Sequence, residues 1–293
     1  MKILAVIDTL GWGTHRCAEE VERVTGQDFT IIDSYMLDDV DYERYDLCVA
    51  WIDSPLQSII DADPKIPVAV RVTGWKSVWR LTNSPITSDD LSGILACNEE
   101  IAQSIEYSYS PRVTTIPNGV NENIFIPRAR RIISNKWGWC GRTRDEQKNF
   151  PLAAKIAEHP KINVIFKTQQ WNEDGTLVQT NWPDEMVDYY HSLLGLYRTS
   201  AFEGSSNVLL EAMSSALPVV ATPSGIARKI LSADLLCTGV THFLQTMKAI
   251  QRDHEQATIL GEINRQIILE GHRWSHRADQ YNEFFKECIE YGV

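Results

Sequence analysis

The sequence predicts an α/β protein with two doubly wound, Rossmann-like domains and a cleft between them. Short apolar runs alternate with amphipathic segments along most of the chain, which is typical of parallel strands covered by helices on both faces. The 293 residues suffice for two domains of ordinary size. A stretch rich in Pro and Gly at 116–127 separates two such series. Ligands of these folds bind at the carboxyl ends of the strands.

The first series contains six apolar runs that predict strands, at 3–7, 29–32, 47–51, 68–72, 93–97 and 113–116. Amphipathic segments at 14–24 and 99–107 predict two of the helices between them. The loop before the first helix contains Gly13, and a glycine there lets backbone approach a ligand closely. An ordinary turn between strand and helix explains this loop equally well.

The second series begins near Lys136. Strands are predicted at 136–141, 162–167, 196–202, 218–221 and 234–237, and helices at 147–157, 184–194, from 207 onward, and at 226–231. Three further helices, at about 242–252, 255–269 and 274–290, end the chain. The second half therefore repeats the alternation of the first half.

The stretch from Glu203 to Glu211 combines a small polar turn with the start of a helix. Gly204, Ser205 and Ser206 follow the first carboxylate, and either serine is a natural N-cap for a helix that begins at Asn207. Free backbone N–H groups at a helix N-terminus bind anions. Two carboxylates beside such a site indicate a ligand that carries both phosphates and hydroxyls.

The charge distribution and the cysteines restrict the classes of binding partner and the cellular compartment that we expect. Residues 1–115 hold nine Lys or Arg against nineteen Asp or Glu, so nearly all of the net charge of −11 lies in the first half. Such an acidic half disfavours nucleic acid and anionic membranes as partners. The six cysteines show no metal-ligand spacing, which predicts reduced thiols and a cytoplasmic protein. No apolar run approaches the ~18 residues of a transmembrane helix.

Four stretches resemble glycosyltransferase family 4, the retaining, nucleotide-sugar-dependent enzymes of the GT-B fold. In chain order, they are the loop 11–16, the segment 116–127 with Asn118 and Gly119, the pair Arg142 and Lys148, and the segment 203–222 with its two glutamates. The resemblance implies an N-terminal acceptor domain over 1–120, a donor domain over 121–274 and a C-terminal helix, 275–293, that crosses back to the first domain.

The same resemblance implies roles for the site residues. Arg142 and Lys148 hold the donor diphosphate, Glu211 takes the ribose hydroxyls, and Glu203 lies beside the transferred sugar. Gly13 and the segment 204–207 (Gly204, Ser205, Ser206 and Asn207) complete the predicted donor site. Fixed cations stabilise the charge that builds on the leaving nucleotide, so no metal and no cofactor are expected beyond a donor such as a UDP- or GDP-sugar. The nucleotide base is expected to contact the segment 168–182.

The chain departs from the family pattern at several of these positions. Arg142 and Lys148 are six positions apart where the family usually has five, so Arg144 is a possible substitute for Arg142. Serines occupy 205 and 206 in place of an aromatic residue and a glycine, and Thr73 stands where the family often has histidine. Because of these departures, the sequence does not identify the sugar that is transferred. They also leave two alternatives: a non-catalytic nucleotide-sugar-binding module and, less favoured, a Rossmann oxidoreductase that would use the loop 11–16.

Three tryptophans predict an aromatic acceptor pocket in the first domain. Trp12, Trp51 and Trp75 each lie within a few residues of the carboxyl end of a predicted strand, and Thr73 lies beside the last of them. Indole faces stack on the apolar faces of sugar rings. Packing in the core or at its rim is the alternative for each. The acceptor is expected to be a saccharide, a small molecule or a protein, and the sequence leaves the oligomeric state open.

Replacing each tryptophan by alanine tests this pocket. An indole that stacks on the acceptor should raise the acceptor KM when it is removed, because the stacking contact is lost. The KM of each variant is compared with that of the intact chain in a transfer assay. Unchanged KM values in all three variants would remove the hypothesis.

Overall fold

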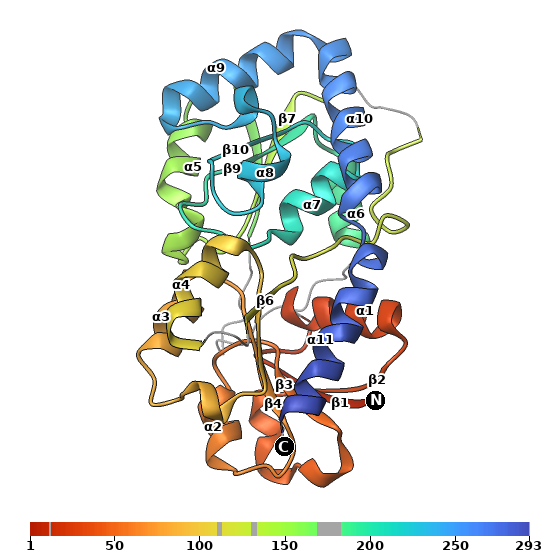
Figure 1. The fold of residues 1–293 in the computed structure, drawn as a ribbon. Helices are drawn as coiled ribbons and strands as arrows, with labels where there is room; N and C mark the ends of the chain where they lie inside the picture. Colours follow the sequence, from red (N-terminus) through yellow and green to blue (C-terminus); the bar gives the residue numbers. More distant parts are fainter. Residues whose placement is uncertain (12, 110–112, 130–133, 169–182, 293) are drawn as a thin grey trace. The chain divides into compact units, whose positions relative to one another are not determined.

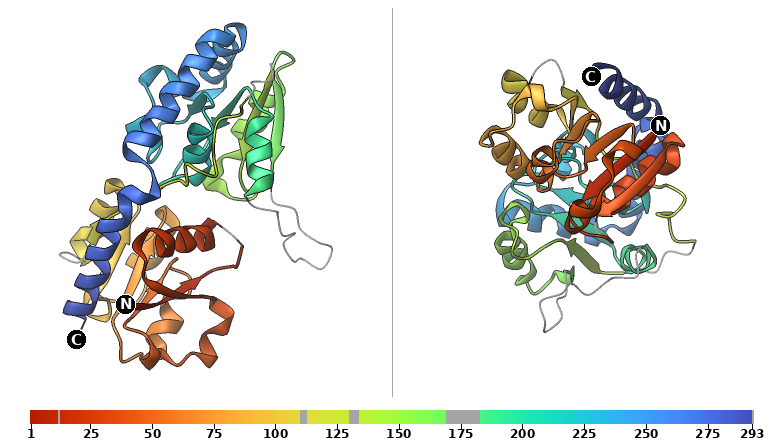
Figure 2. Two further views of the ribbon diagram at one scale, coloured as in Figure 1. Left: turned by 90° about the vertical axis from the view of Figure 1, so that its right-hand side faces the viewer. Right: turned by 90° about the horizontal axis from the view of Figure 1, so that it is seen from below.

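The computed structural model describes residues 1–11, 13–109, 113–129, 134–168 and 183–292. They form two compact units: the first comprises Met1–Asn118 and Trp274–Val293, and the second Gly119–Arg273. Each unit has one all-parallel sheet with helices packed on it (Figures 1 and 2), which confirms the predicted α/β architecture. Within the described ranges, no helix is long and apolar enough to cross a membrane.

The first unit has a six-stranded sheet in the order β2-β1-β3-β4-β5-β6. Its strands are β1 (Lys2–Ile7), β2 (Asp28–Asp33), β3 (Leu47–Ala50), β4 (Val68–Val72), β5 (Gly93–Ala96) and β6 (Val113–Thr115). Its helices are α1 (Gly13–Thr25), α2 (Leu56–Asp61), α3 (Trp75–Thr82), α4 (Glu99–Tyr109) and α11 (Ala278–Tyr291). The sequence did not predict α2 and α3.

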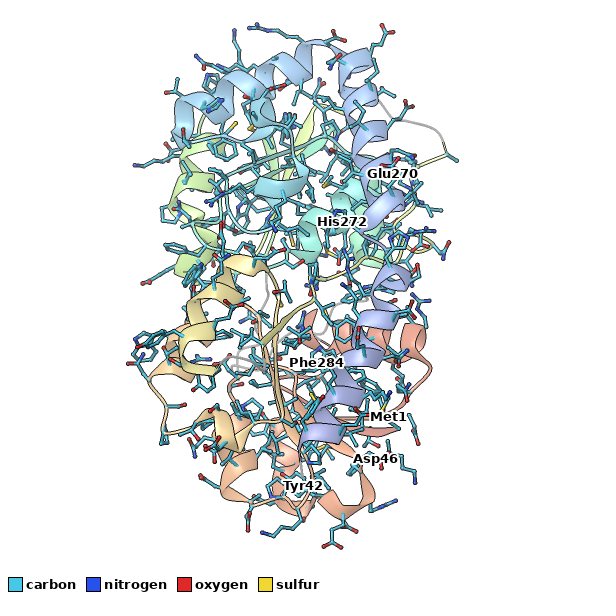
Figure 3. All side chains as sticks on the ribbon, viewed as in Figure 1. Met1, Tyr42, Asp46, Glu270, His272 and Phe284 are labelled. Carbon is cyan, nitrogen blue, oxygen red and sulfur yellow. The ribbon has the colours of Figure 1, made fainter. Side chains whose placement is uncertain are left out.

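Alternation along the strands divides the core of this unit into two layers. Successive strand residues point to opposite faces of a sheet. Even-numbered residues of β1, such as Leu4, pack with α2, α3 and α4, whereas odd-numbered ones, such as Ile3, pack with α1 and α11. Tyr281, Phe284 and Phe285 of α11 are buried in the second layer, and Figure 3 labels Phe284 on this helix. Apolar strands buried on both sides therefore explain the continuous apolar runs in the sequence.

The second unit has a four-stranded sheet in the order β10-β9-β7-β8. Its strands are β7 (Lys136–Cys140), β8 (Asn163–Lys167), β9 (Gly195–Arg198) and β10 (Val219–Ala221). Its helices are α5 (Phe150–Ala157), α6 (Asp184–His191), α7 (Asn207–Ser214), α8 (Ala227–Ile230), α9 (Gly239–Arg252) and α10 (His254–Gly271).

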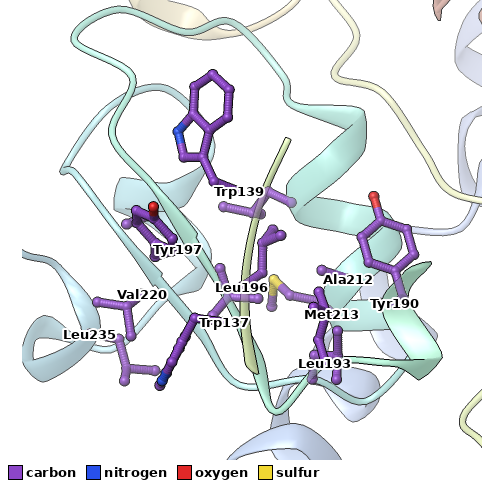
Figure 4. Close-up of a cluster of buried hydrophobic side chains, with 14 of the residues drawn as sticks. Trp137, Trp139, Tyr190, Leu193, Leu196, Tyr197, Ala212, Met213, Val220 and Leu235 are labelled. Atoms are coloured by element: carbon purple, nitrogen blue, oxygen red, sulfur yellow. The ribbon is translucent and has the colours of Figure 1, made fainter. Parts of the chain in front are cut away.

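The two faces of β7 carry side chains of different size, with tryptophan on one face and glycine on the other. Trp139 packs against Phe150 of α5, with ring centroids 5.2 Å apart, and against Phe166 of β8 at 5.9 Å. Gly138 lies between the two tryptophans of this strand, and a Cβ there would come within 2.3 Å of Leu193 and 2.6 Å of the Tyr189 hydroxyl. The absent side chain thus lets α6 and the turn after it approach the sheet. Figure 4 shows the resulting cluster of buried side chains.

Two predicted elements differ from the structure. The predicted strand at 234–237 is wrong, because Ala233–Leu235 forms a 3-10 turn and only Leu236 makes an isolated bridge, to Ala221. The predicted helix 147–157 is interrupted at Asn149, whose φ of 48° is left-handed. Glu146–Lys148 is instead a separate 3-10 turn, and α5 begins after it. Lys148 consequently lies in a loop at the end of the sheet.

Gly261 of α10 permits a close helix contact that an alanine should break. A Cβ at this position would lie 2.0 Å from the carbonyl oxygen of Ala216, which is backbone and cannot move aside cheaply. We expect Gly261→Ala to cost about 1–3 kcal/mol, as overpacking usually does, despite the better helix propensity of alanine. The thermal unfolding midpoint should fall by several degrees.

Gly271→Ala is the matched control on the same helix. Nothing lies within 4 Å of a Cβ built at Gly271, so this change should leave the midpoint unchanged or raise it slightly. Equal midpoints for the two variants would contradict the packing argument.

Candidate functional site

The strand order of the second unit reverses between β7 and β9. β8 lies on one side of β7, and β9 and β10 lie on the other. At such a reversal the loops that follow the two strands diverge, and ligands of doubly wound sheets bind there. The segments that leave the carboxyl ends of β7 and β9 are 141–149 and 199–206. They contain all of the predicted donor-site residues except Gly13, Asn207 and Glu211.

Hydrogen bonds to backbone carbonyl oxygens connect these two segments. The Thr199 hydroxyl donates to the carbonyl oxygens of Lys148, at 2.9 Å, and Asn149, at 3.1 Å. The Ala201 N–H donates to the carbonyl oxygen of Gln147 at 2.9 Å. The indole N–H of Trp139 donates to the Thr199 hydroxyl at 3.0 Å, so the connection reaches into the core. Lys148 is therefore held at the end of the sheet by its own backbone.

A cluster of ionised side chains, from the buried Arg198 to the half-buried Glu203 and Lys148, lies where the two segments meet. The Lys148 ammonium is 2.8 and 3.1 Å from the two carboxylate oxygens of Glu203. The guanidinium of Arg198, the last residue of β9, donates to Glu203 at 2.5 Å and to the Ser200 hydroxyl at 2.8 Å. Side-chain exposure is 6% for Arg198, 13% for Glu203 and 26% for Lys148. These three residues are called the Lys148–Glu203–Arg198 cluster below.

The two cations keep Glu203 ionised. Burial alone would raise the pKa of its carboxyl group, but the charges of Arg198 and Lys148, with hydrogen bonds from Lys148 and Ser200, outweigh burial and lower the pKa to about 2. One carboxylate between two cations leaves the cluster with a net charge of +1. The cluster therefore presents positive charge at the carboxyl end of the sheet.

The start of α7 lies directly after this cluster. The Ser206 hydroxyl accepts a hydrogen bond from the Leu209 N–H at 3.3 Å, so Ser206 is the N-cap. Gly204, Ser205 and Ser206 are buried, and Asn207 is half-buried at the first position of the helix. The prediction of a capped helix that begins at residue 207 is confirmed.

The loop after β10 supports the turn that contains Glu203 from behind. The Ile226 N–H donates to the Gly204 carbonyl oxygen at 3.1 Å. Gly225 has a left-handed φ of 54°, and a Cβ there would lie 2.4 Å from the Gly204 oxygen and 2.5 Å from the Glu203 oxygen. Only glycine satisfies both the backbone angle and this contact. The position of Glu203 thus depends on the loops that follow β7, β9 and β10.

Glu211 lies one turn into α7 and is 9% exposed. The Tyr190 hydroxyl donates to its carboxylate at 2.7 Å. Figure 4 shows Tyr190 at the edge of the apolar cluster, with its hydroxyl pointing away from it. Burial raises the pKa of Glu211 from an ordinary 4.5 to about 7, and the hydrogen bond from Tyr190 opposes this only in part. The ionisation of Glu211 therefore changes near neutral pH.

The thiol of Cys140 lies close enough to Glu211 and to the cationic residues to be affected by the charges of both. Burial, followed by the negative charge of Glu211, raises the pKa of its thiol to about 12, against the opposing effect of Lys148, Arg198 and Lys167. Lys167, at the end of β8, is 2.7 Å from Glu185. The carboxyl ends of β7, β8 and β9 therefore carry one connected set of charges.

Arg142 and Arg144 are exposed and lie in the same loop as Lys148. The Arg142 carbonyl oxygen accepts from the Asp145 N–H at 3.3 Å, which folds the loop back toward the 3-10 turn. Residues 169–182 of the expected base-binding segment lie outside the described residues. Among the described residues, no group of three or more His, Cys, Asp or Glu side chains is placed to hold a metal ion.

In the first unit, the structure separates the predicted acceptor residues. Trp51 is fully buried, stacked on Tyr281 with centroids 6.1 Å apart, and the Arg71 guanidinium lies 5.7 Å from its ring centroid. Its prediction as an acceptor contact is therefore wrong, because Trp51 directly follows β3 and its side chain is packed in the core layer that α11 covers. Trp12 lies outside the described residues.

Thr73 and Trp75 remain at the carboxyl end of β4. Both are half-buried, and the Thr73 and Ser77 hydroxyls are 3.5 Å apart. Asp53, which the sequence analysis did not select, accepts from the Ser77 hydroxyl at 2.5 Å and from Arg80 at 3.1 Å. Gly13 begins α1, next to Gly11, whose N–H donates to His15 at 2.8 Å.

Comparison with known proteins identifies the fold. No family profile matches the chain, and no curated protein sequence does. Sucrose-phosphate synthase from Thermosynechococcus elongatus matches with a TM-score of 0.78 and 13% identity, over 99% of this chain and 100% of that chain. The Anabaena protein HepE in complex with UDP-glucose matches with a TM-score of 0.75 and 14% identity, over 98% and 99%. The chain has the GT-B fold.

A third GT-B structure is the lipopolysaccharide outer core galactosyltransferase WaaB in its apo form. It matches with a TM-score of 0.62 and 13% identity, over 98% of this chain and 99% of that chain. All three matches extend over nearly the whole chain, so both sheets of the GT-B fold are included in the similarity.

Two residues of the second unit were missed in the sequence. Arg198 is the partner of Glu203, and its signal is an arginine within a run that otherwise reads as a buried strand. Tyr190 is the partner of Glu211 and is 21 positions away from it. No local pattern connects these two residues, because the packing of α6 beside α7 brings them together.

The raised pKa of Glu211 predicts a pH dependence of stability. Between pH 4.5 and 7 the folded GT-B chain keeps a proton that the unfolded chain has released. The contribution of this group to the free energy of unfolding therefore falls as pH rises through that window, by up to about 3 kcal/mol. Glu211→Gln cannot release a proton and should lack this decline.

Chemical denaturation at pH 5 and pH 7.5 measures the effect. The variant should gain stability relative to the intact chain on going from the lower to the higher pH. Tyr190→Phe is the companion variant, since loss of the hydrogen bond should raise the pKa further. Parallel profiles for the intact chain and Glu211→Gln would contradict the assignment.

Proposed function

We propose that this chain is a retaining glycosyltransferase of family 4. It moves a sugar from a nucleotide-diphosphate sugar to an acceptor hydroxyl, and it does so without a metal ion. The observation that carries the proposal is the Lys148–Glu203–Arg198 cluster, a net positive site at the reversal point of the second sheet, followed by a capped helix that holds Glu211. Positive charge and a carboxylate at one sheet edge suit a ligand with both a diphosphate and a ribose.

The donor lies along the carboxyl end of the second sheet in this proposal. Lys148 and Arg142, with Arg144 as the alternative to Arg142, bind the diphosphate. Glu211 accepts hydrogen bonds from the ribose hydroxyls, with Tyr190 holding one of its oxygens. The UDP-glucose bound by HepE, which has the same fold, makes UDP-sugars the first donors to test.

Glu203 lies on the sugar side of the diphosphate, with Gly204, Ser205, Ser206 and Asn207 next to it. Because Glu203 stays ionised, it accepts hydrogen bonds from sugar hydroxyls and stabilises positive charge that develops on the sugar ring. These residues position the sugar while the diphosphate leaves.

Transfer proceeds with retention of configuration at the anomeric carbon. The acceptor hydroxyl attacks on the face from which the diphosphate leaves, and the leaving phosphate oxygen takes the acceptor proton. Fixed cations stabilise the transition state more than the ground state, since charge accumulates on the phosphate as the bond breaks.

The acceptor binds to the first unit in this proposal. Thr73 and Trp75, at the carboxyl end of β4, are the residues assigned to it, and the acidic balance of this half favours a saccharide, small molecule or protein. No disulfide bond joins the described cysteines, and we place the protein in the cytoplasm. The rival function is a non-catalytic module that binds a nucleotide sugar, as the departure from the family pattern at Thr73 would allow.

Release of UDP from UDP-glucose and GDP from GDP-mannose, with and without a panel of saccharide acceptors, tests the proposal. A glycosyltransferase releases the nucleotide, and the rate rises with the correct acceptor. Binding of the donor without release, under all acceptors, would favour the rival module. Absence of both binding and release would contradict the proposal itself.

Glu211→Gln is the site control in this experiment. Loss of charged hydrogen bonds to the ribose, each worth about 1.5–3 kcal/mol, should weaken donor binding roughly 10- to 100-fold. Isothermal calorimetry at pH 8, where Glu211 of the intact chain is ionised, measures the change. Unchanged affinity in the variant would remove Glu211 from the donor site.

A further inference from the structure

We propose that Arg198 is a positioning residue that neutralises Glu203 and so leaves the charge of Lys148 available to the donor diphosphate. The inference rests on the proposed function, because it concerns how the same site binds a nucleoside diphosphate. It adds a residue that is absent from the motif pattern from which the site was predicted. Its basis is the geometry of the Lys148–Glu203–Arg198 cluster.

The two cations of the cluster differ in their access to a ligand. Lys148 is 26% exposed and extends from a loop, whereas Arg198 is 6% exposed and belongs to a strand. Arg198 is anchored by Ser200 as well as by Glu203. An anion that approaches the sheet edge therefore meets Lys148, while Arg198 stays behind the carboxylate. This difference argues against a direct contact between Arg198 and the diphosphate.

Without Arg198, the cluster would be a neutral pair. Glu203 would still bind the Lys148 ammonium, at 2.8 and 3.1 Å, and a diphosphate would have to compete with this carboxylate for the same ammonium. With Arg198 present, Glu203 keeps a charged partner when Lys148 turns to the ligand. A buried carboxylate left without a partner is strongly unfavourable, so this replacement is what permits Lys148 to move.

The charges of the cluster predict a specific pattern of UDP affinities in a double-mutant cycle of Arg198 and Glu203. Arg198→Met removes the cation but keeps an apolar side chain suited to a buried strand position. It should weaken UDP binding at least tenfold, because Glu203 then retains Lys148. Glu203→Gln should bind UDP at least as tightly as the intact chain, since both cations are released. UDP carries no sugar, so the sugar-side role proposed for Glu203 does not enter the measurement.

The double variant Arg198→Met with Glu203→Gln decides the question. Removal of the competing carboxylate should restore UDP binding to within about threefold of the intact chain. A purely structural role for Arg198 predicts no such rescue. Calorimetric titration with UDP, and with GDP in parallel, gives the dissociation constants, and thermal unfolding reports on the fold of each variant.

Lys167→Met is the matched control for the general electrostatic field. It also removes one positive charge from an ion pair at the carboxyl edge of the same sheet, the pair with Glu185. Its effect on UDP binding should be smaller than that of Arg198→Met, and Glu203→Gln should not rescue it. Equal losses in the two cation variants would overturn the proposal.

The remaining outcomes separate this inference from the proposed function. If the intact chain binds neither UDP nor GDP, the proposed function fails and the inference fails with it. If the intact chain binds UDP and Arg198→Met binds it equally well, only the inference about Arg198 is overturned. The same holds if the double variant binds UDP no better than Arg198→Met does. If Arg198→Met does not fold, the Glu203→Gln variant decides, and weaker UDP binding in it overturns the proposal.

Discussion

The buried carboxylate of Glu203 constrains the whole carboxyl edge of the second sheet. A charge enclosed to this extent is stable only with opposite charges and hydrogen bonds around it. Arg198 reaches it from the end of β9 and Lys148 from the loop after β7, and the latter loop is itself fixed by Thr199. The left-handed backbone at Asn149 is what ends the 3-10 turn and places Lys148 there. The ion cluster therefore depends on where β9 ends and on the conformation of the loop after β7.

The second carboxylate of the site is in a different electrostatic situation. Glu203 has two cations and a low pKa, whereas Glu211 has a tyrosine hydroxyl and a pKa near neutrality. Two glutamates on the same short segment thus differ because one faces the strand ends and the other faces α6. Near neutral pH the Glu203 carboxylate therefore stays charged, whereas Glu211 changes its charge. Spacing in the sequence alone does not reveal this difference.

Much of the fold follows from local sequence properties. Apolar runs identify the strands because parallel strands are buried on both faces, and the serines before Asn207 identify the start of α7 because a cap needs a hydroxyl. The strand predicted at 234–237 fails because an apolar run can also pack as a tight turn against a sheet edge. Trp51 could have been placed correctly from alternation, since it shares its face of the strand with Leu47 and Val49, which pack beneath α11.

Less of the candidate site than of the fold can be predicted from the sequence. Lys148 and Glu203 follow a family pattern, but Arg198 is recognisable only if one asks where a buried strand arginine finds its carboxylate. The partnership of Tyr190 with Glu211 depends on how two helices pack, and no short-range rule contains that information. Contacts between distant segments are the part of the site that required a structure.

The environment of Cys140 has a consequence for the chemistry of the protein. Thiols near several cations usually ionise readily and become reactive toward alkylating agents and oxidants. Burial and the neighbouring Glu211 hold this thiol in its neutral form, even though Lys148, Arg198 and Lys167 act on it. The charged edge of the sheet therefore contains a half-buried thiol that stays protonated, and a protonated thiol reacts with electrophilic reagents more slowly than a thiolate does.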